Sequence, residues 1–378
     1  MRLFFLLFPI LAFSQVLKGR VVDQDNKPLE SASVFIAQST ARATTQADGS
    51  FSLAVPPGSW LLVVTYVGYE SVVVASSQFS DFDQIQVIKL SPIAEQIREV
   101  SVMSAKDRER YLKLFKEHLL GSSRNADKSK LLNPEVVSFY YDAASRTLEA
   151  YADDPLQIEI PALNYHLELV LAQFSLNWNA NLAKFEGYAS YSDLRTPDEV
   201  NIRKIKKNRQ TAYLGSTQHF LRTAYDDTFS DAGFVVRAFS KTPNPAYPSP
   251  EVRKALIEQY RATKIYPEEL RIPEHVVTFK PGQLKWSEFV AKLRGVHSIF
   301  MDDYLEIRYL NASEEERYQT RYKRNHGHQV SQVKANRPVA FFADGTYTDV
   351  DGLVFFGYMG WKKLSDMVPN DYVPVEEE

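Results

Sequence analysis

The sequence contains no cysteine, and its 15 glycines among 378 residues form no glycine-rich loop of the kind that cradles phosphate groups. Without cysteine the chain can form neither disulfide bonds nor a thiolate nucleophile. Its stability must therefore come from packing, and a chain of this length can bury a core large enough to supply it. The length also predicts two or three domains.

The sequence also lacks an excess of charge of one sign and a long apolar run. Lysine and arginine total 44 against 47 aspartates and glutamates, which gives a net charge of −3. This near balance argues against a nucleic acid as an obligate partner. Beyond the first residues, no apolar stretch reaches the about 20 residues that a transmembrane helix needs, so we expect no transmembrane span after signal removal.

The first residues, MRLFFLLFPILAFSQ, have the pattern of a secretory signal peptide. Arg2 precedes an apolar run over residues 3–11, and Ala12 and Ser14 supply small residues at the cleavage positions. The run is too short for a membrane anchor, and no cysteine follows it as a lipoprotein signal would require. We therefore predict a signal peptide at residues 1–14, a mature chain from Gln15, and export to the periplasm or the outer membrane.

Residues 16–90 consist of short strand-like runs separated by turns. The pair Asp48-Gly49 predicts a hairpin turn because glycine accepts positive φ, and Phe51, Leu53 and Val55 then alternate onto one face. A corner at residues 56–58 (Pro-Pro-Gly) precedes the nearly continuous apolar run SWLLVVTYVGYESVVV. Short strands with regularly spaced turns predict an all-β sandwich.

Three stretches of this segment, LKGRVVDQDNKPLESASVFI, TTQADGSFSL and VTYVGYES, resemble the carboxypeptidase regulatory-like domain of Gram-negative envelope proteins. The resemblance implies a transthyretin-like, Greek-key β-sandwich. It also implies an accessory or carbohydrate-binding-like module without catalytic residues. TonB-dependent receptors carry such a module, but their barrels need several hundred more residues of alternating strands, so this chain is not such a receptor by itself.

Residues 91–105 are predicted to form a linker, and residues 106–378 an α+β domain of unknown function with an antiparallel sheet and several helices. AKDRERYLKLFKEHLLG predicts an amphipathic helix that Gly121 ends. Closely spaced strand-like runs between residues 135 and 191 predict an antiparallel meander. Ser249 and Pro250 begin another predicted helix, and Asp344-Gly345 marks a second hairpin turn.

The segment from Thr196 to about residue 225 predicts one long helix, with a capping box between Thr196 and Glu199 and a possible break at Gly215. Arg209 falls on its apolar stripe with Ile202, Ile205, Ala212, Tyr213, Phe220 and Ala224, while Arg203, Lys204 and Lys207 point away. A buried guanidinium is costly unless it is paired or snorkels to solvent. A structural pair is the favoured interpretation of Arg209, and contact with an anion or ligand is the alternative.

No catalytic motif stands out in the sequence. The seven histidines form no His-Glu-x-x-His zinc motif, and no serine lies in a Gly-x-Ser-x-Gly turn. His326 and His328, the only close pair, lie in a basic stretch that favours an exposed loop over a metal site. Adjacent acids at 153–154 and 302–303 are candidates for a pair of catalytic carboxylates that the fold would bring together, as glycoside cleavage requires. Three tryptophans could stack on sugars, namely Trp178, Trp286 and Trp361, although core packing is the more ordinary use.

We therefore predict a non-enzymatic exported cell-envelope protein, a binding or accessory component with no cofactor and no metal. Its expected partner is another envelope protein or a glycan or peptide ligand, and the candidate ligand-binding side chains are Arg209, His219 and Trp178. The alternative is a peptide or glycan hydrolase whose carboxylates the fold brings together. A structural role in an envelope assembly is a third hypothesis.

Overall fold

The structure, a computed structural model, describes residues 15–375 except 80, 83, 94–102, 181 and 325. The predicted signal peptide and most of the predicted linker lie outside the described residues. The chain divides into two compact units. Unit 1 comprises Met1–Ala212 together with Lys363–Glu378, and unit 2 comprises Tyr213–Lys362.

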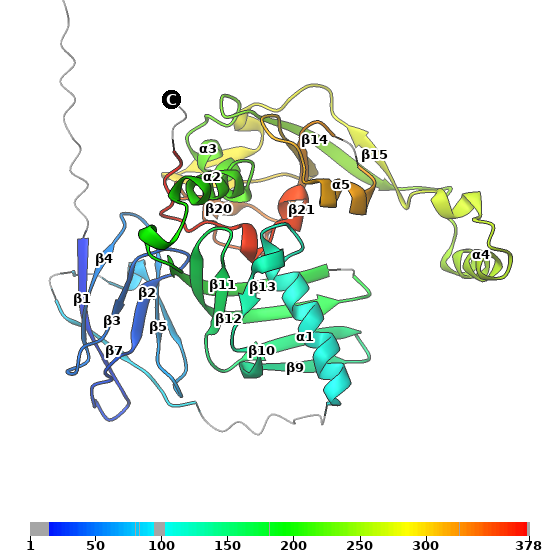
Figure 1. Ribbon diagram of the computed structural model, residues 1–378. Helices are drawn as coiled ribbons and strands as arrows, with labels where there is room; N and C mark the ends of the chain where they lie inside the picture. The colour runs from blue at the N-terminus through cyan, green and yellow to red at the C-terminus, as the bar shows by residue number, and fades with distance from the viewer. Residues whose placement is uncertain are drawn as a thin grey trace, which may run out of the picture. The chain divides into compact units, whose positions relative to one another are not determined.

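Unit 1 begins with two small sheets that share one apolar core. The first has the order β4-β1-β7, from β1 (Gln15–Val22), β4 (Ser50–Val55) and β7 (Gln86–Lys89). The second has the order β3-β2-β5-β6, from β2 (Ser33–Ile36), β3 (Arg42–Thr44), β5 (Leu61–Thr65) and β6 (Val72–Ala75). Leu17, Val34, Phe51 and Trp60 belong to the shared core. The predicted all-β N-terminal domain is confirmed (Figure 1).

The Asp48-Gly49 turn forms as predicted, but the strands on its two sides do not pair with each other. Gly49 has φ +76° and donates its N–H to the Gln46 carbonyl (2.8 Å). The strand before the turn, β3, pairs with β2, whereas the strand after it, β4, pairs with β1. The turn therefore carries the chain from one sheet to the other, and the expected hairpin between adjacent strands is wrong at this position.

A six-stranded sheet follows in unit 1. It runs in the order β8-β11-β12-β10-β9, and β13 pairs with the other edge of β12. Its strands are β8 (Lys130–Leu131), β9 (Val137–Asp142), β10 (Thr147–Ala152), β11 (Leu156–Ile160), β12 (Tyr165–Asn177) and β13 (Leu182–Asp193). All pairs are antiparallel, as predicted. The order is not a simple meander, because β12 is long enough to pair with β11 at one end and β10 at the other.

Helix α1 (Ala105–Leu120) covers this sheet (Figure 1). The Ser104 side chain caps its first turn by accepting the Asp107 N–H (3.1 Å), and Gly121 ends it with φ +95°. Phe115 is fully buried, and its ring lies 4.8 Å from that of Phe174. The predicted amphipathic helix is therefore confirmed, and its apolar stripe is the face that packs on the sheet.

The segment predicted as one long helix is divided into three. The capping box of Thr196 and Glu199 is present, but it closes a single 3₁₀ turn. Helix α2 (Ile202–Tyr213) starts afresh with Asn201, whose side chain accepts the Lys204 N–H (3.0 Å). Gly215, at φ +73°, then breaks the chain before α3 (Thr217–Tyr225), as predicted. The capping box of Thr196 and Glu199 therefore forms as predicted, but the helix that it was expected to begin starts only at Ile202.

Unit 2 contains a five-stranded sheet in the order β15-β14-β18-β19-β21 and a three-stranded sheet in the order β16-β17-β20. The strands are β14 (Phe234–Pro243), β15 (His275–Phe279), β16 (Val290–Leu293), β17 (Val296–Ile299), β18 (Tyr304–Tyr309), β19 (Gln329–Ala335), β20 (Val339–Phe341) and β21 (Leu353–Gly357). Phe220, Phe234, Phe289 and Phe341 lie in its core. The predicted turn at Asp344-Gly345 is confirmed, since Phe341 and Tyr347 form an antiparallel bridge across it.

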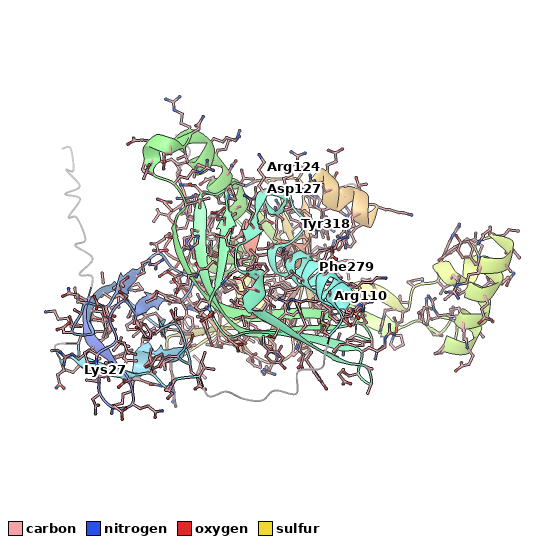
Figure 2. All side chains as sticks on the ribbon, turned by 60° about the horizontal axis from the view of Figure 1, so that its bottom comes forward. Lys27, Arg110, Arg124, Asp127, Phe279 and Tyr318 are labelled. Atoms are coloured by element: carbon pink, nitrogen blue, oxygen red, sulfur yellow. The ribbon has the colours of Figure 1, made fainter. Side chains whose placement is uncertain are left out.

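Helix α4 (Pro250–Thr263) interrupts the chain between β14 and β15. Ser249 caps it and Pro250 is its first residue, as predicted. None of its residues is buried, and its side chains point outward on all sides (Figure 2). The remaining helices of unit 2 are α5 (Glu316–Tyr322) and α6 (Tyr358–Trp361). Across the described residues, the helices are all too short or too polar to cross a membrane.

Short 3₁₀ turns lie at Ser76–Gln78, Ala126–Lys128, Pro134–Val136, Pro197–Glu199, Glu268–Arg271, Trp286–Glu288 and Leu364–Asp366.

Replacement of Gly49 tests the turn between the two N-terminal sheets. A Cβ at this position would lie 2.5 Å from the Val21 carbonyl oxygen, in addition to the strain of positive φ. We expect Gly49→Ala to lower the free energy of unfolding by about 2 kcal/mol or more. Gly58→Ala is the control, because Gly58 also has positive φ but its Cβ would meet open space, so about 1 kcal/mol is expected. Urea unfolding of both variants measures the difference, and equal losses would contradict the clash.

Candidate functional site

A cavity of about 510 Å³ opens in unit 1 where four parts of the chain meet. Helix α2, the adjacent ends of β12 and β13, the β2–β3 turn and the segment after Pro369 form its walls. Its lining residues are Thr40, Arg42, Tyr165, Tyr191, Ser192, Asp193, Lys206, Arg209, Pro369, Asp371, Tyr372, Val373 and Val375. Three cationic side chains, two carboxylates and three tyrosines therefore face one space, which is a polar site with aromatic walls.

Strand contacts hold the N-terminal sandwich against the six-stranded sheet at this cavity. Ser39 and Ser190 form a parallel bridge, and the Tyr191 N–H donates to the Ser39 carbonyl (2.9 Å). The Gln38 side chain adds a bond to the Gly187 carbonyl (2.8 Å). Because the bond between Tyr191 and Ser39 joins backbone to backbone, the turn that carries Thr40 is held beside the end of β13.

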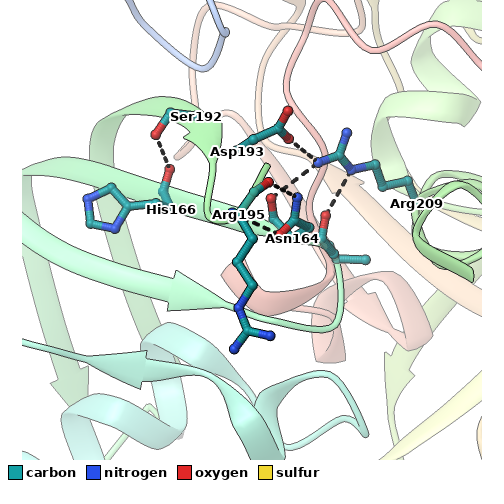
Figure 3. Close-up of polar contacts among 7 residues, drawn as sticks. Asn164, His166, Ser192, Asp193, Arg195 and Arg209 are labelled. Carbon is teal, nitrogen blue, oxygen red and sulfur yellow. Dashed lines mark hydrogen bonds and ion pairs between the residues drawn. The ribbon is translucent and has the colours of Figure 1, made fainter. Parts of the chain in front are cut away.

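Arg209 anchors α2 to the floor of the cavity (Figure 3). Its Nε donates to the Leu163 carbonyl (2.8 Å), and its Nη2 donates to the Asn164 carbonyl (3.2 Å) and to Asp193 Oδ1 (2.7 Å). The guanidinium carbon also lies 3.9 Å from the centre of the Tyr165 ring. The guanidinium satisfies backbone carbonyls, pairs with a carboxylate and stacks on an aromatic face at once. The favoured interpretation of Arg209 as a structural pair matches these contacts.

The turn that receives Arg209 is itself fixed by Asn164, a residue with φ +54°. Its side chain donates to the Arg195 carbonyl (3.0 Å) and accepts the Arg195 N–H (3.1 Å), as Figure 3 shows. Asn208, one residue before Arg209, donates to the Ala162 carbonyl (2.7 Å). Two neighbouring side chains of α2 thus bond to backbone of the same β11–β12 turn, so the position of the helix is set by hydrogen bonds.

The segment after Pro369 returns to α2 and is held by one side-chain amide. Gln210 Nε2 donates to the Val375 carbonyl (2.9 Å), and Gln210 Oε1 accepts the Val375 N–H (3.0 Å). The same oxygen accepts the Tyr372 hydroxyl (3.2 Å). Val373 is 80% exposed, so apolar burial does not hold this segment. We call residues 371–375 the tail segment. The hydrogen bonds of Gln210 hold its backbone against α2.

Asp371 joins the tail segment to the N-terminal sandwich. Its carboxylate accepts the Thr40 N–H (3.1 Å) and the Thr40 hydroxyl. Beside it, Arg42 lies 3.4 Å from Glu168, a carboxylate that Ser33 and Thr65 also contact. The cavity therefore already binds one carboxylate of its own chain with neutral donors, and three cationic side chains line the same cavity.

The aromatic walls are neutral at physiological pH. Burial raises the pKa of Tyr165 well above its usual range, although the charge of Arg209 opposes the rise. Burial also raises the pKa of the fully buried Tyr191. Neither phenol can act as an acid or a base near neutral pH, so these rings offer the cavity surface and hydroxyl groups only.

His219 lies in unit 2, in the core below the break at Gly215. Its Nδ1 accepts the Gly215 N–H (3.1 Å), and its ring packs on Tyr213, Phe234 and Tyr309. Burial, with a smaller contribution from Arg222, lowers the pKa of His219 to about 4. The imidazole is therefore neutral and caps a backbone group. Its predicted part in ligand binding stays a prediction.

Trp178 follows β12 and packs edge-on against Tyr141, with ring centres 5.7 Å apart. It is not among the residues that line the cavity, so the structure does not bring it together with Arg209 there. Trp361 is 9% exposed and packs on Tyr318 and Tyr358. Trp286 bonds through Nε1 to the Ala224 carbonyl (2.6 Å). The proposed use of Trp178 as a ligand contact stays a prediction.

The histidine pair and the acidic pair at 302–303 that the sequence offered for metal or acid chemistry lie in unit 2. The rings of His326 and His328 lie 5.9 Å apart. Asp303 pairs with Lys280 (3.0 Å), and the Asp302 carbonyl accepts from Lys334. No group of three or more metal-ligating side chains is found in the described part of the chain. The residues that sequence reasoning missed are Gln210, Asp371 and Tyr372, because only the tertiary fold returns the tail segment to α2.

Substitution of Arg209 tests its structural part. Arg209→Ala removes the bonds to two backbone carbonyls, and we expect a loss of about 2 kcal/mol in the free energy of unfolding. Arg203→Ala on the same helix is the control, because Arg203 is exposed and a change within about 0.5 kcal/mol is expected. Chemical unfolding of the two variants gives the comparison. A stable Arg209→Ala protein would show that the helix is held elsewhere.

The lowered pKa of His219 predicts a stability that depends on pH. An unfolded histidine binds a proton near pH 6.5, whereas the folded one does so only near pH 4, so protons favour the unfolded state between these values. Stability should fall by up to about 3 kcal/mol as the pH drops from 6.5 to 4. His219→Gln should flatten this dependence, and His326→Gln, at an exposed site, should preserve it. Unfolding curves at several pH values test both.

Comparison with known proteins supports one assignment. Residues 16–88 match the family model of the carboxypeptidase regulatory-like domain. No curated protein matches the chain.

Among solved structures, a DUF3823 family protein from Bacteroides ovatus shares 13% identity, covering 48% of this chain and 82% of that one, with a TM-score of 0.17. A protein of unknown function from Bacteroides fragilis shares 10% identity, covering 91% and 94%, with a TM-score of 0.16. These TM-scores are too low to carry an argument about fold or function. The family model alone identifies residues 16–88, and this part of the chain is a carboxypeptidase regulatory-like domain, as its sequence predicts.

Proposed function

We propose that the protein is an exported, non-enzymatic binding component of the cell envelope, and that the cavity of unit 1 binds an extended acidic peptide segment of a partner. The signal-peptide pattern at residues 1–14 supports export to the periplasm or the outer membrane. The carboxypeptidase regulatory-like domain supports an accessory role. The cavity supplies the chemistry of the binding site.

The observation that carries this proposal is the pair of hydrogen bonds between the Gln210 side chain and the backbone of the tail segment. Its amide donates to and accepts from the backbone of Val375, which is the reciprocal pair that two opposed residues of an antiparallel ladder form. Such a pair recognises an extended peptide without reading its side chains. The cavity already holds a peptide in this way, and a partner segment of similar chemistry can replace the tail segment.

The charges around the cavity favour an acidic segment. Lys206 and Arg42 line the same cavity as Asp371; Lys206 is exposed, and Arg42 lies 3.4 Å from Glu168. A carboxylate of the ligand would meet these cations and the Thr40 donors that now hold Asp371. Charge complementarity of this kind sets specificity and the rate of association more than total affinity.

A glycan is the less favoured ligand at this site. Sugar recognition uses an open aromatic face, but Arg209 covers a face of Tyr165 and Tyr191 is fully buried. Trp178, the tryptophan that we considered for stacking, does not line the cavity. The walls therefore offer hydrogen-bonding edges and charges, which suit a peptide backbone better than a sugar ring.

The alternative of a hydrolase draws on the two carboxylates in the cavity, Asp193 and Asp371. A glycosidase needs one carboxyl group as an acid and the other as a base or nucleophile facing the substrate. Here Asp193 pairs with Arg209 at 2.7 Å, and Asp371 accepts two bonds from Thr40. Both carboxylates are engaged by the protein's own donors, so the arrangement supports binding better than hydrolysis.

Charge reversal on α2 tests the ligand class. Peptide and glycan arrays probed with the purified protein should show retention on extended acidic peptides. Lys206→Glu should weaken this binding about tenfold or more, since a cation that faces the ligand becomes an anion. Lys204→Glu carries the same charge change on the same helix outside the cavity lining and should bind as the unchanged protein does.

A second comparison separates competition by the tail from binding itself. A chain that ends at Asn370 should bind the peptide DYVPVEEE, the sequence of residues 371–378, more tightly than the full chain. Circular dichroism checks that the shortened chain is folded. Retention on glycans alone, or no binding of this peptide by the folded shortened chain, would overturn the proposal.

A further inference from the structure

The edge strand β15 of unit 2 is exposed along its whole length. It is the end strand of its five-stranded sheet in the part of the chain that the structure describes. All five of its residues, HVVTF, are exposed, and Val277 is 46% exposed. Phe279, labelled in Figure 2, lies at its end. An exposed, apolar edge strand presents unpaired backbone groups that another strand can join.

The register with β14 fixes which backbone groups point outward. Phe279 lies opposite Phe239 and Val277 opposite Lys241. In the same register, the Lys280 N–H donates to the Ala238 carbonyl and the Asn244 N–H donates to the Glu274 carbonyl, both at 2.9 Å. Even-numbered residues of this strand therefore bond toward β14. Because the direction alternates along a strand, the N–H and C=O groups of His275, Val277 and Phe279 point out of the sheet.

We propose that β15 pairs with β15 of a second copy of this chain, antiparallel and with the two-fold axis at Val277. This register places every outward residue opposite an outward residue: Val277 faces its own copy, and His275 faces Phe279. Such directly opposed residues exchange both backbone hydrogen bonds. Their side chains also match, as a β-branched pair at the centre with an aromatic pair on each side.

The flanking residues make this register self-complementary in charge. Counting outward from Val277, Glu274 of one copy falls opposite Lys280 of the other, and the same pair recurs on the far side of the axis. Opposite charges across a ladder stabilise it, and like charges destabilise it. Lys280 now pairs with Asp303 at 3.0 Å, and both carboxylates can share one exposed ammonium group.

Two prolines bound the ladder at equal distances from its centre. Pro273 and Pro281 are odd-numbered like the outward residues, and neither has an N–H to donate. A slip of the pairing by two residues would place Pro281 opposite His275, a pair that can form only one of its two backbone bonds, and would separate Glu274 from Lys280. The charge pairs therefore favour the register centred on Val277, and the prolines stop the sheet from extending further.

Helix α4 does not cover the outer edge of β15. Helix α4 is inserted just before β15, and both overall views place it beyond the end of the β14–β15 hairpin (Figures 1 and 2). The ladder is short, and a standard protein interface buries about 1,600 Å² in total. We therefore expect a weak dimer that forms as the protein concentration rises.

Charge-reversal variants test the pairing. Sedimentation velocity of the purified protein up to about 100 µM should show a monomer–dimer equilibrium. Glu274→Lys places lysine opposite Lys280, and Lys280→Glu places glutamate opposite Glu274, so each variant alone should raise the dimer dissociation constant about tenfold. An equimolar mixture of the two should recover dimerisation, because each variant supplies the charge that the other needs.

Glu258→Lys on α4 makes the same charge change away from the ladder and should leave the dissociation constant unchanged. Recovery in the mixture also shows that both variants are folded. A protein that stays monomeric over this range, a mixture that stays as weak as its components, or an equal effect of Glu258→Lys would each overturn the proposal.

Discussion

The arrangement of unit 1 around its cavity depends on the guanidinium of Arg209. Helix α2 has few buried residues, so apolar packing alone would hold it weakly. Arg209 and Asn208 instead bond to backbone carbonyls of the β11–β12 turn, and Asp193 completes the ion pair. The cavity is thus built on the guanidinium of Arg209; of the other two lining cations, Arg42 lies 3.4 Å from Glu168 and Lys206 is exposed.

The sequence predicted helix ends correctly where residues close by in the chain cap them. Gly121 ends α1, and Ser249 with Pro250 begins α4, as predicted, because capping needs only neighbouring residues. The same reasoning overestimated the helix after Thr196, where the capping box closes a single turn. Ile202, expected on the buried stripe, is 38% exposed as the first residue of α2. The spacing of apolar residues predicts which face of a helix is apolar, but it does not predict whether another helix or strand covers that face.

The candidate site was predictable only in part. Arg209 stood out because a charge on an apolar stripe demands a partner, yet its partners lie up to 46 residues away and have no sequence signature. Gln210 and Asp371 gave no signal, since a glutamine on a helix and an aspartate in a charged end are ordinary. Aromatic content misled in another way. Trp361, one of the tryptophans considered for stacking on sugars, stacks on Tyr358 and is committed to packing.

Unit 1 is discontinuous, because the whole of unit 2 is inserted between residues 212 and 363. During synthesis from the N-terminus, α2 and the sandwich exist long before the segment that bonds to Thr40 and Gln210. Closing so long a loop is entropically unfavourable until the inserted unit has compacted and brought its ends together. Unit 1 can therefore be completed only after unit 2 has been translated, because residues on both sides of unit 2 belong to it.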